Sequence, residues 1–202
     1  MKPGRKRSFD REEALDKAMR LFWKGGYSGT SLSELTTGLG INKPSLYAAF
    51  GNKEHLFKLA LAYYQEKYTT PRYATLTEPR TDPLPIRLNR FLHTIAETIS
   101  DPEMPLGCLY VNSSCETGAK DMTSGIIEEI FSVKKESMQY FINVLKEEQT
   151  LGNLPQKTDV DAMSNYLMTV LFGMGVLAKN GSTLADLEPV IKIAVDSLFP
   201  DN

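Results

Sequence analysis

Residues 30–57 read TSLSELTTGLGINKPSLYAAFGNKEHLF, and this stretch decides the fold. Ser31 and Glu34 have the spacing of a capping box, which begins a helix, and the Gly-Leu-Gly of residues 38–40 ends it. Asn42 and Pro44 then suit the cap and the first turn of a second short helix. Two short helices joined by a glycine turn, the second with polar and basic groups in its first turn, are typical of a helix-turn-helix. The sequence therefore predicts contact with the major groove of duplex DNA.

The composition is that of an ordinary globular protein of one or two domains. Of the 202 residues, 42% are hydrophobic and 24% are charged, and domains usually hold about 100–150 residues. The longest nearly apolar run, residues 166–178, is shorter than the ~20 residues that a membrane span needs, and the N-terminus lacks the apolar region of a secretory signal. Two cysteines cannot form a disulfide framework and lack zinc-ligand spacing with the two histidines. We expect a cytoplasmic protein without a membrane partner, a metal or a cofactor.

Charge is distributed unevenly along the chain. Residues 1–67 contain 12 Lys and Arg against 7 Asp and Glu, whereas the remainder contains 11 against 18. Such an asymmetry is expected when one end of a protein meets a polyanion. The basic arm before the first helix includes Arg5, Lys6 and Arg7, which we expect to follow the DNA backbone or to enter the minor groove. A solvated terminus is the plainer interpretation of the same three charges.

Apolar residues recur at helical spacing along most of the chain, and no run of alternating residues requires a strand. The first helix is predicted to begin after Asp10 and to stop at Gly25-Gly26, and another follows the helix-turn-helix from Asn52. The proline-rich residues 69–85 are predicted to be a loop. Further helices are predicted over residues 86–99, 123–150, 159–179 and 184–198, and a short buried segment is predicted over residues 106–116.

The predicted fold class is therefore all-α, with two functional regions. Residues 1–51 are expected to form an N-terminal three-helix helix-turn-helix DNA-binding domain with its basic arm. Residues 52–202 are expected to form an all-α effector-binding and dimerisation domain. The single helix-turn-helix offers limited contact area, so two copies on adjacent major-groove faces are the usual solution.

The arm, the three-helix start and the segment GINKPSLYAAFGNKEHLF together resemble the TetR/AcrR family of bacterial transcriptional regulators. The resemblance covers residues 8–57 and includes the Gly40-Ile41 turn, the Ser45-Leu46-Tyr47 step, Phe50 and Asn52-Lys53-Glu54 at the family's spacing. The order of elements after residue 60 is similar to the family's all-α effector and dimerisation domain. The segment LGCLYVNSSCE also resembles one found in a large subset of the family. The resemblance implies a ligand-responsive regulator, and repression is the family's usual mode.

The first turn of the second motif helix holds the side chains best placed to reach base edges. Lys43 can donate to guanine, Ser45 can contact either kind of base, and the ring of Pro44 can pack on a thymine methyl group. Helix initiation alone would also explain Pro44. The resemblance implies that Tyr47 reaches a phosphate through its hydroxyl. Lys53, at the start of the following helix, is expected to attract a phosphate together with nearby backbone amides.

Three hydroxyl residues at the start of the first motif helix are further candidates. Thr30, Ser31 and Ser33 can either cap that helix or meet the phosphate backbone. Capping is a sufficient explanation for Ser31. All three are kept as candidate DNA contacts.

The last two predicted helices are the best candidates for a dimer face. Two such helices from each chain would make a four-helix bundle, and small glycines allow close approach. Packing of the same stripes within one chain is the alternative. The candidate dimerisation residues are Leu167, Val170, Leu171, Met174, Leu177, Val190, Ile191, Ala194 and Leu198.

The middle helices are rich in aromatic residues and methionine, which would suit a cavity for a small apolar or aromatic effector. Residue by residue, ordinary core packing is the more common role of such side chains. The candidate effector-binding residues are Tyr63, Phe91, Met104, Cys108, Tyr110, Phe131, Met138, Phe141, Met168 and Phe172.

Cys108 and Cys115 lie seven residues apart, which on a helix is ~10 Å along the axis and too far for an unstrained disulfide. The default interpretation is that both cysteines are buried as small hydrophobic side chains. The main alternative is that one of them senses electrophiles or oxidants. The leading hypothesis for the whole chain is a homodimeric repressor that binds a palindromic operator and is released by a small effector. A DNA-organising or division-linked protein of the same fold is the alternative from another class. Because no phosphate-binding glycine loop or metal cluster is present in the sequence, we expect no enzyme activity.

Overall fold

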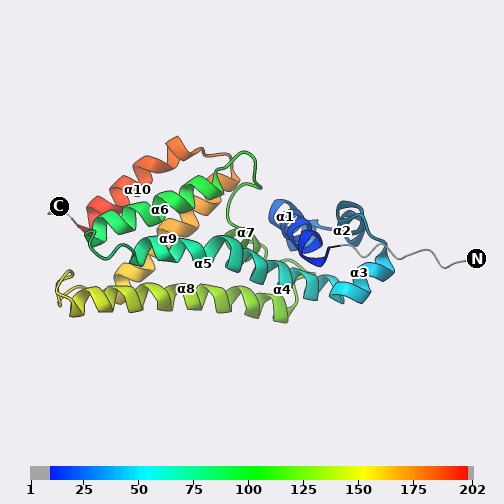
Figure 1. Cartoon of the computed structure of the whole chain (residues 1–202), viewed down its shortest axis with the longest axis horizontal. Coiled ribbons are helices and arrows are strands. Elements are labelled where there is room, and N and C mark those ends of the chain that lie inside the picture. Colours follow the sequence, from blue (N-terminus) through cyan, green and yellow to red (C-terminus); the bar gives the residue numbers. More distant parts are fainter. Residues whose placement is uncertain (1–9, 200–202) are drawn as a thin grey trace, which may run out of the picture.

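The computed structural model describes residues 10–199, and every regular element within that range is helical, which confirms the all-α prediction. Figure 1 shows α2 and α3 at one end of an elongated molecule, with α6, α9 and α10 toward the other. The elements are α1 (Arg11–Gly29), α2 (Leu32–Leu39), α3 (Lys43–Phe50), α4 (Lys53–Tyr64), the π-helical η1 (Gln65–Thr69), α5 (Thr70–Thr77), α6 (Leu84–Ile99), α7 (Leu109–Ser114), α8 (Ser124–Thr150), α9 (Val160–Lys179) and α10 (Leu184–Leu198).

The N-terminal helices are held by a hydrophobic core that α4 shares. The rings of Phe22 in α1 and Phe57 in α4 meet edge to face with their centroids 5.0 Å apart. The same core reaches Leu109 at the start of α7 and Ile126 near the start of α8. The helix α4 packs against elements from both sides of the residue 51/52 boundary. It therefore joins the DNA-binding helices to the rest of the chain. The large buried side chains of this core include Phe22, Trp23, Leu35, Leu46, Phe50, Phe57 and Tyr64.

The end of the first helix combines an interruption with a short continuation. Gly26 has φ 73° and ψ 175°, so the regular helix is broken where the sequence predicted a stop. Helical structure nevertheless resumes up to Gly29 before the chain turns at Thr30. A positive φ is easily adopted only by glycine, because glycine has no Cβ.

The proline-rich segment is not a loop over its whole length, so the prediction for residues 69–85 is corrected. The helix α5 covers Thr70–Thr77 and continues from α4 through the π-turn of η1. Pro71 lies in the first turn of α5, where the N–H that proline lacks costs little. Only residues 78–83 connect α5 to α6 without helix.

A second hydrophobic core joins α5, α6, α8, α9 and α10. Within it, Arg87 of α6 and Glu148 of α8 form an ion pair of 2.7 Å between Nη2 and Oε1, and both side chains are only 2% exposed. A pair buried this deeply ties the two helices together through one specific geometry. The core side chains around it include Leu88, Phe91, Leu92, Phe141, Leu145, Met163, Leu167, Leu187 and Ile191.

Within the described chain, α9 is the one helix long and apolar enough to cross a membrane by length and composition. Its inward face, which includes Met163, Leu167 and Met174, is buried against other helices of the second core. That packing accounts for the buried part of its apolar composition, and a core helix of a globular protein meets the same criterion.

Candidate DNA interface and effector cavity

The helix-turn-helix is built by the caps that the sequence indicates. In α2 the Ser31 hydroxyl accepts a hydrogen bond from the Glu34 amide at 3.1 Å, while the Glu34 carboxylate accepts one from the Ser31 amide at 2.7 Å. Gly40 then adopts φ 67° and reverses the chain. The side chain of Asn42 accepts from the Ser45 amide at 2.9 Å and begins α3. These local bonds fix the angle between α2 and α3 before any DNA is present.

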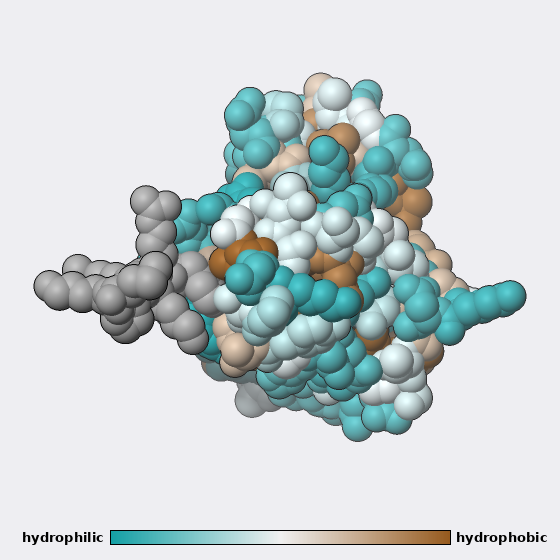
Figure 2. All heavy atoms as spheres, turned by 90° about the vertical axis from the view of Figure 1, so that its right-hand side faces the viewer, coloured by the Kyte–Doolittle hydropathy of each residue, from teal (hydrophilic) through white to brown (hydrophobic). Residues whose placement is uncertain are grey.

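The first turn of α3 presents its candidate side chains to solvent. Lys43 and Pro44 are exposed, Ser45 is half-buried, and Tyr47 is 41% exposed. The Lys43 ammonium lies 5.7 Å from the centre of the Tyr47 ring, so the two candidate contacts are neighbours on one surface. Figure 2 views the molecule from this end and shows a mostly hydrophilic to neutral surface with small apolar patches. The view therefore shows no large apolar patch for an apolar partner on the coloured part of this face.

Two candidate DNA contacts already have partners inside the protein. Thr30 is buried, and its hydroxyl donates to the Gly26 carbonyl at 2.7 Å. The Lys53 ammonium lies 4.1 Å above the ring of Tyr27 and 3.9 Å from a carboxylate oxygen of Asp121. Burial lowers the pKa of Lys53, and Asp121 acts in the opposite direction.

The other candidates differ in how far the structure describes them. Ser31 and Ser33 are exposed, although Ser31 already caps α2. Arg5, Lys6 and Arg7 lie outside the described residues. The exposed part of α3 is therefore the surface on which the DNA hypothesis depends most.

Replacement of Thr30 by valine separates its structural role from a DNA role. Valine has nearly the same shape but cannot donate to the Gly26 carbonyl, and a lost buried hydrogen bond costs about 1 kcal/mol. We expect the free energy of unfolding in urea to fall by about that amount while operator affinity stays within twofold of the wild type. A large loss of affinity with unchanged stability would instead make Thr30 a DNA contact.

Polar contacts join the DNA-binding helices to the segment around α7. The Trp23 indole donates to the Gly107 carbonyl at 2.8 Å, and the Asn112 side chain donates back to the Trp23 carbonyl at 3.4 Å. Beside them, the Ser28 hydroxyl donates to Asp121 at 2.6 Å, and the Ser28 amide donates to Glu116 at 3.1 Å. The end of α1 is thus held from α7 and from the loop that follows it.

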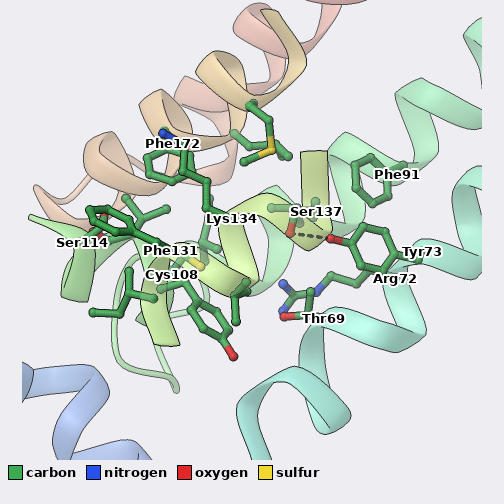
Figure 3. Close-up of a pocket in the computed structure, with 18 residues that line it drawn as sticks. Thr69, Arg72, Tyr73, Phe91, Cys108, Ser114, Phe131, Lys134, Ser137 and Phe172 are labelled. Atoms are coloured by element: carbon green, nitrogen blue, oxygen red, sulfur yellow. Dashed lines mark hydrogen bonds between the residues drawn. The ribbon is translucent and has the colours of Figure 1, made fainter. Parts of the chain in front are cut away.

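A cavity of about 310 Å³ lies among η1 and helices α5 to α9. Figure 3 shows its labelled side chains converging from these elements. Six of the candidate effector-binding residues line it: Phe91, Cys108, Tyr110, Phe131, Met168 and Phe172. Its volume is at the lower end of the range for small-molecule sites, and its wall is mainly apolar and aromatic.

Four candidate effector-binding residues lie outside the cavity lining. Phe141 packs in the second core, with its ring centroid 5.7 Å from that of Phe91, and Met138 packs against the same core. Met104 accepts a hydrogen bond from Arg20 at 3.1 Å between nitrogen and sulfur, and Tyr63 accepts one from Lys67 at 3.3 Å. These side chains stabilise helix contacts rather than the cavity wall.

The polar groups of the lining were not identified from the sequence. Thr69 and Arg72 come from η1 and α5, and Lys134 and Ser137 come from α8. Thr69 and Arg72 fall in the segment predicted to be a loop. Tyr68 and Arg72 are four residues apart, so they would share one face if this segment were helical. The prolines obscured that signal.

The two cysteines occupy the two ends of α7. Cys108 precedes the helix, lines the cavity, and its sulfur is 3.6 Å from the Tyr64 hydroxyl, which donates to it. Cys115 follows the helix and is exposed. Near Cys108, burial raises the pKa of the Tyr110 hydroxyl, so at neutral pH it is a donor, and it donates to the Leu61 carbonyl of α4 at 2.9 Å.

The candidate dimerisation residues divide into buried and accessible groups. Leu167, Met174, Ile191 and Ala194 are buried inside the subunit and so are not available as an outer face. Leu171 lines the cavity. Val170, Val190 and Leu198 are half-buried, and Leu177 is exposed. The large apolar side chains exposed on α9 and α10 are Tyr166, Val176, Leu177 and Ile193.

Comparison with known proteins agrees with this geometry. Residues 14–60 match the family model of bacterial regulatory proteins, tetR family. The chain is 33% identical over 198 residues to the HTH-type transcriptional repressor ComR of Escherichia coli strain K12, covering 96% of this chain and 90% of that protein. It is 29% identical over 187 residues to the HTH-type transcriptional repressor BdcR of the same organism, covering 92% and 87%.

A solved structure gives the same result in three dimensions. A cysteine variant of the TetR family regulator CifR, in complex with 26-bp double-strand operator DNA, aligns with a TM-score of 0.86 and 32% sequence identity, covering 96% of this chain and all of that one. The matched region includes both the helix-turn-helix and the helical remainder. This chain therefore belongs to the TetR family and is a DNA-binding transcriptional regulator.

Proposed function

We propose that this protein is a ligand-responsive repressor that binds a palindromic operator as a homodimer and is released by a small molecule in the cavity. The observation that carries the proposal is the position of the cavity. Its wall includes η1 and α5, which continue directly from α4, and α4 follows the candidate recognition helix α3 after two residues. A molecule that changes the wall therefore acts on the helix to which the DNA-binding surface is attached.

Two contacts support this coupling between cavity and DNA surface. Tyr110, which lines the cavity, donates to the Leu61 carbonyl in α4 at 2.9 Å. Asp16 of α1 accepts from Lys67 of η1 at 2.6 Å. Burial alone would raise the pKa of Asp16, but hydrogen bonds from Lys67 and Arg20 outweigh it and hold that pKa below its ordinary value. The Lys67–Asp16 bond thus holds the π-turn against α1, while Thr69 and Arg72 line the cavity.

The mechanism follows from the geometry of a dimer on DNA. Two recognition helices read adjacent half-sites only when their separation matches one turn of B-DNA, about 34 Å. An effector that prefers a different setting of α4 moves α3 away from that separation. It lowers DNA affinity only to the extent that it binds the two settings unequally.

The exposed apolar side chains of α9 and α10 are the proposed dimer contact. Ile193 is 66% exposed, and Leu177 is also exposed. A hydrogen bond of 3.1 Å between Tyr166 and Ser197 holds the two helices side by side at this surface. Apolar side chains on two adjacent helices can pack against the same pair on a second copy.

Selection of binding sequences from random duplex DNA tests the proposal. The wild type is expected to enrich a palindrome and to show a steep loss of affinity with salt, as phosphate contacts require. A double variant, Leu177→Arg with Ile193→Arg, places two like charges at the dimer contact. We expect half the solution mass in light scattering and loss of the palindrome.

The outcomes separate the parts of the proposal. A palindrome bound equally well by the double variant would reject α9 and α10 as the dimer contact but keep the regulator. Weak binding without an enriched sequence would instead favour the DNA-organising alternative. The mainly apolar cavity favours the ligand-responsive hypothesis over that alternative, since a DNA-organising role has no use for it.

A further inference from the structure

One cationic side chain in the cavity wall lacks a full set of partners. Arg72 of α5 is only 8% exposed, and its Nη2 atom has no hydrogen-bond acceptor. Figure 3 shows the side chain extending from α5 toward the middle of the drawn residues, with Thr69 beside it. A guanidinium buried with an unpaired nitrogen is costly, because the group keeps its charge at all physiological pH values.

Nothing in the described part of the chain neutralises this charge. Within residues 10–199, no Asp or Glu forms an ion pair with Arg72, and no Asp or Glu lines the cavity. The remaining contacts of Arg72 are uncharged: the ring of Tyr68 lies 6.0 Å from the guanidinium carbon, and the Tyr64 hydroxyl is a hydrogen-bond partner of the side chain. The second cation of the lining, Lys134 of α8, lies 5.9 Å from the Phe172 ring and likewise has no carboxylate partner in the described chain.

We infer that the cavity takes a small molecule with an apolar body and one negatively charged group, which Arg72 binds. The inference deepens the proposed function and rests on it. The unpaired Nη2 and the hydroxyl of Thr69 provide donors for the anionic group, and a charge-assisted bond to guanidinium is among the strongest polar contacts in proteins. The apolar body lies against Phe91, Met168 and Phe172.

The volume of the cavity limits the chemical class of the ligand further. About 310 Å³ is at the small end of known ligand sites, so the molecule is of the size of a substituted aromatic acid or a medium-chain fatty acid rather than a polycyclic drug. Carboxylates of this kind are fully ionised at neutral pH. They bring the negative charge that the wall lacks.

The position of Arg72 also explains how binding reaches the DNA. Arg72 lies three residues after η1, on the helix that continues α4, and Tyr68 at the π-turn lies under its guanidinium. When an anion draws the guanidinium toward the cavity, the force is applied to α5 next to its junction with α4. A neutral ligand that only fills the apolar part lacks this contact.

Matched pairs of probes test the inference. The panel consists of benzoate, cinnamate, 1-naphthoate and octanoate, each with its neutral primary amide of nearly equal shape, measured by calorimetry at pH 7.5. For at least one pair the carboxylate is expected to bind about 10- to 100-fold more tightly than the amide, the range for a hydrogen bond to a charged group. In Arg72→Gln the preference is expected to fall to less than threefold, whereas Arg72→Lys keeps part of it.

Lys135→Gln is the matched control, because this exposed neighbour of Lys134 carries the same charge but does not line the cavity. It is expected to leave the preference unchanged. Thermal unfolding of each variant establishes that it is folded. If no pair shows a carboxylate preference, or if Arg72→Gln keeps it, the anion inference is overturned. Release of the selected operator by the amides alone would overturn it while leaving the ligand-responsive repressor intact.

Discussion

Lys43→Ala is expected to lower operator affinity about 30-fold or more without changing the stability of the fold. A good side-chain contact to a base is worth about 1–3 kcal/mol of discrimination, and a homodimer loses it at both half-sites. Lys43 is exposed in the first turn of α3, so its truncation leaves no cavity in the first core. Binding to the selected palindrome, measured by fluorescence anisotropy at fixed salt, gives the change.

Lys146→Ala is the control for this prediction. It removes the same charge from an exposed position near the C-terminal end of α8, at the end of the molecule away from α3 (Figure 1). Its operator affinity is expected to stay within twofold of the wild type. Equal losses in the two variants would mean that Lys43 acts only through net charge, and α3 would then lose its assignment as the recognition helix. Tyr47→Phe is expected to weaken binding less, because it removes one hydroxyl contact and keeps the ring beside Lys43.

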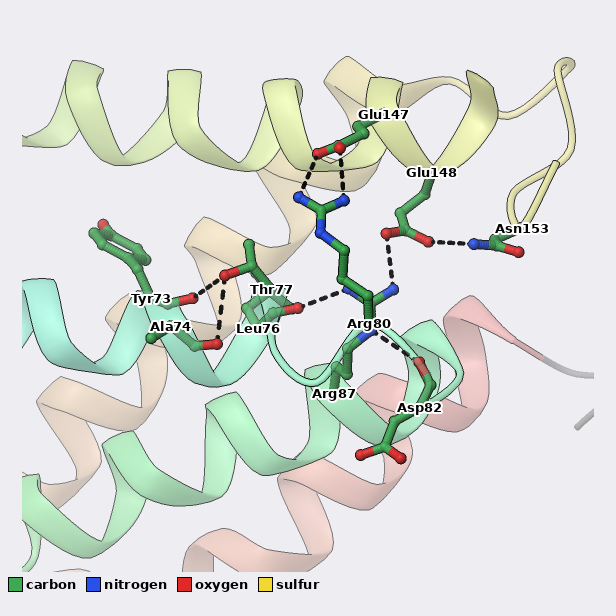
Figure 4. Close-up of polar contacts among 10 residues, drawn as sticks. All are labelled: Tyr73, Ala74, Leu76, Thr77, Arg80, Asp82, Arg87, Glu147, Glu148 and Asn153. Carbon is green, nitrogen blue, oxygen red and sulfur yellow. Dashed lines mark hydrogen bonds and ion pairs between the residues drawn. The ribbon is translucent and has the colours of Figure 1, made fainter. Parts of the chain in front are cut away.

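Glu148→Leu is expected to lower the free energy of unfolding by about 3–5 kcal/mol, because it leaves a buried guanidinium without its counter-charge. Figure 4 shows the partners: Glu148 also accepts from the Asn153 side chain at 2.9 Å, and Arg87 donates to the carbonyls of Leu76 and Asp82. For a chain of this size the loss corresponds to about 6–20 °C in Tm. Calorimetry of the free protein measures it.

The adjacent residue provides a close control. Glu147 forms an ion pair of 2.6 Å with Arg80, but both side chains are about half exposed. Glu147→Leu is expected to change Tm far less, because water replaces the lost partner. Arg87→Met combined with Glu148→Leu should recover part of the loss but not all of it, since two carbonyls then lack their donor. If the two single variants melted at the same temperature, burial would not be what makes the Arg87–Glu148 pair important.

The sequence predicted best what is decided by neighbouring residues. Ser31 with Glu34, Asn42 and Asn52 cap their helices as their spacing indicates, because each capping bond spans only two or three residues. The long helices after residue 84 were predicted to within a few residues for the same reason. The helix α5 was not predicted, because the prolines of residues 69–85 indicated a loop. The sequence gives no sign of the π-turn that lets the helix continue past Pro71.

Roles that depend on distant contacts were not predictable in the same way. Phe91 and Phe141 are both aromatic residues at helical spacing, yet Phe91 lines the cavity and Phe141 does not. Thr30 is polar and follows a glycine, but its hydroxyl is used inside the fold. Arg72 shows the limit most clearly, because an arginine after a proline gives no local sign that helices α6 to α9 will bury it.

The π-turn at Gln65–Thr69 has a consequence for how this helix tolerates change in length. Each residue added to or removed from an α-helix rotates everything beyond it by about 100°. The one wide turn therefore sets the rotational phase of α5 relative to α4, and with it the direction in which Arg72 and Tyr73 point. Because a π-turn holds one residue more than an α-helical turn, a single-residue deletion within η1 is expected to leave a regular α-helix with Arg72 and Tyr73 in nearly the same direction. A single-residue deletion within α4 itself is expected to rotate both side chains by about 100°. The proposed link between cavity and DNA surface thus depends on the number of residues in the helix as well as on its contacts.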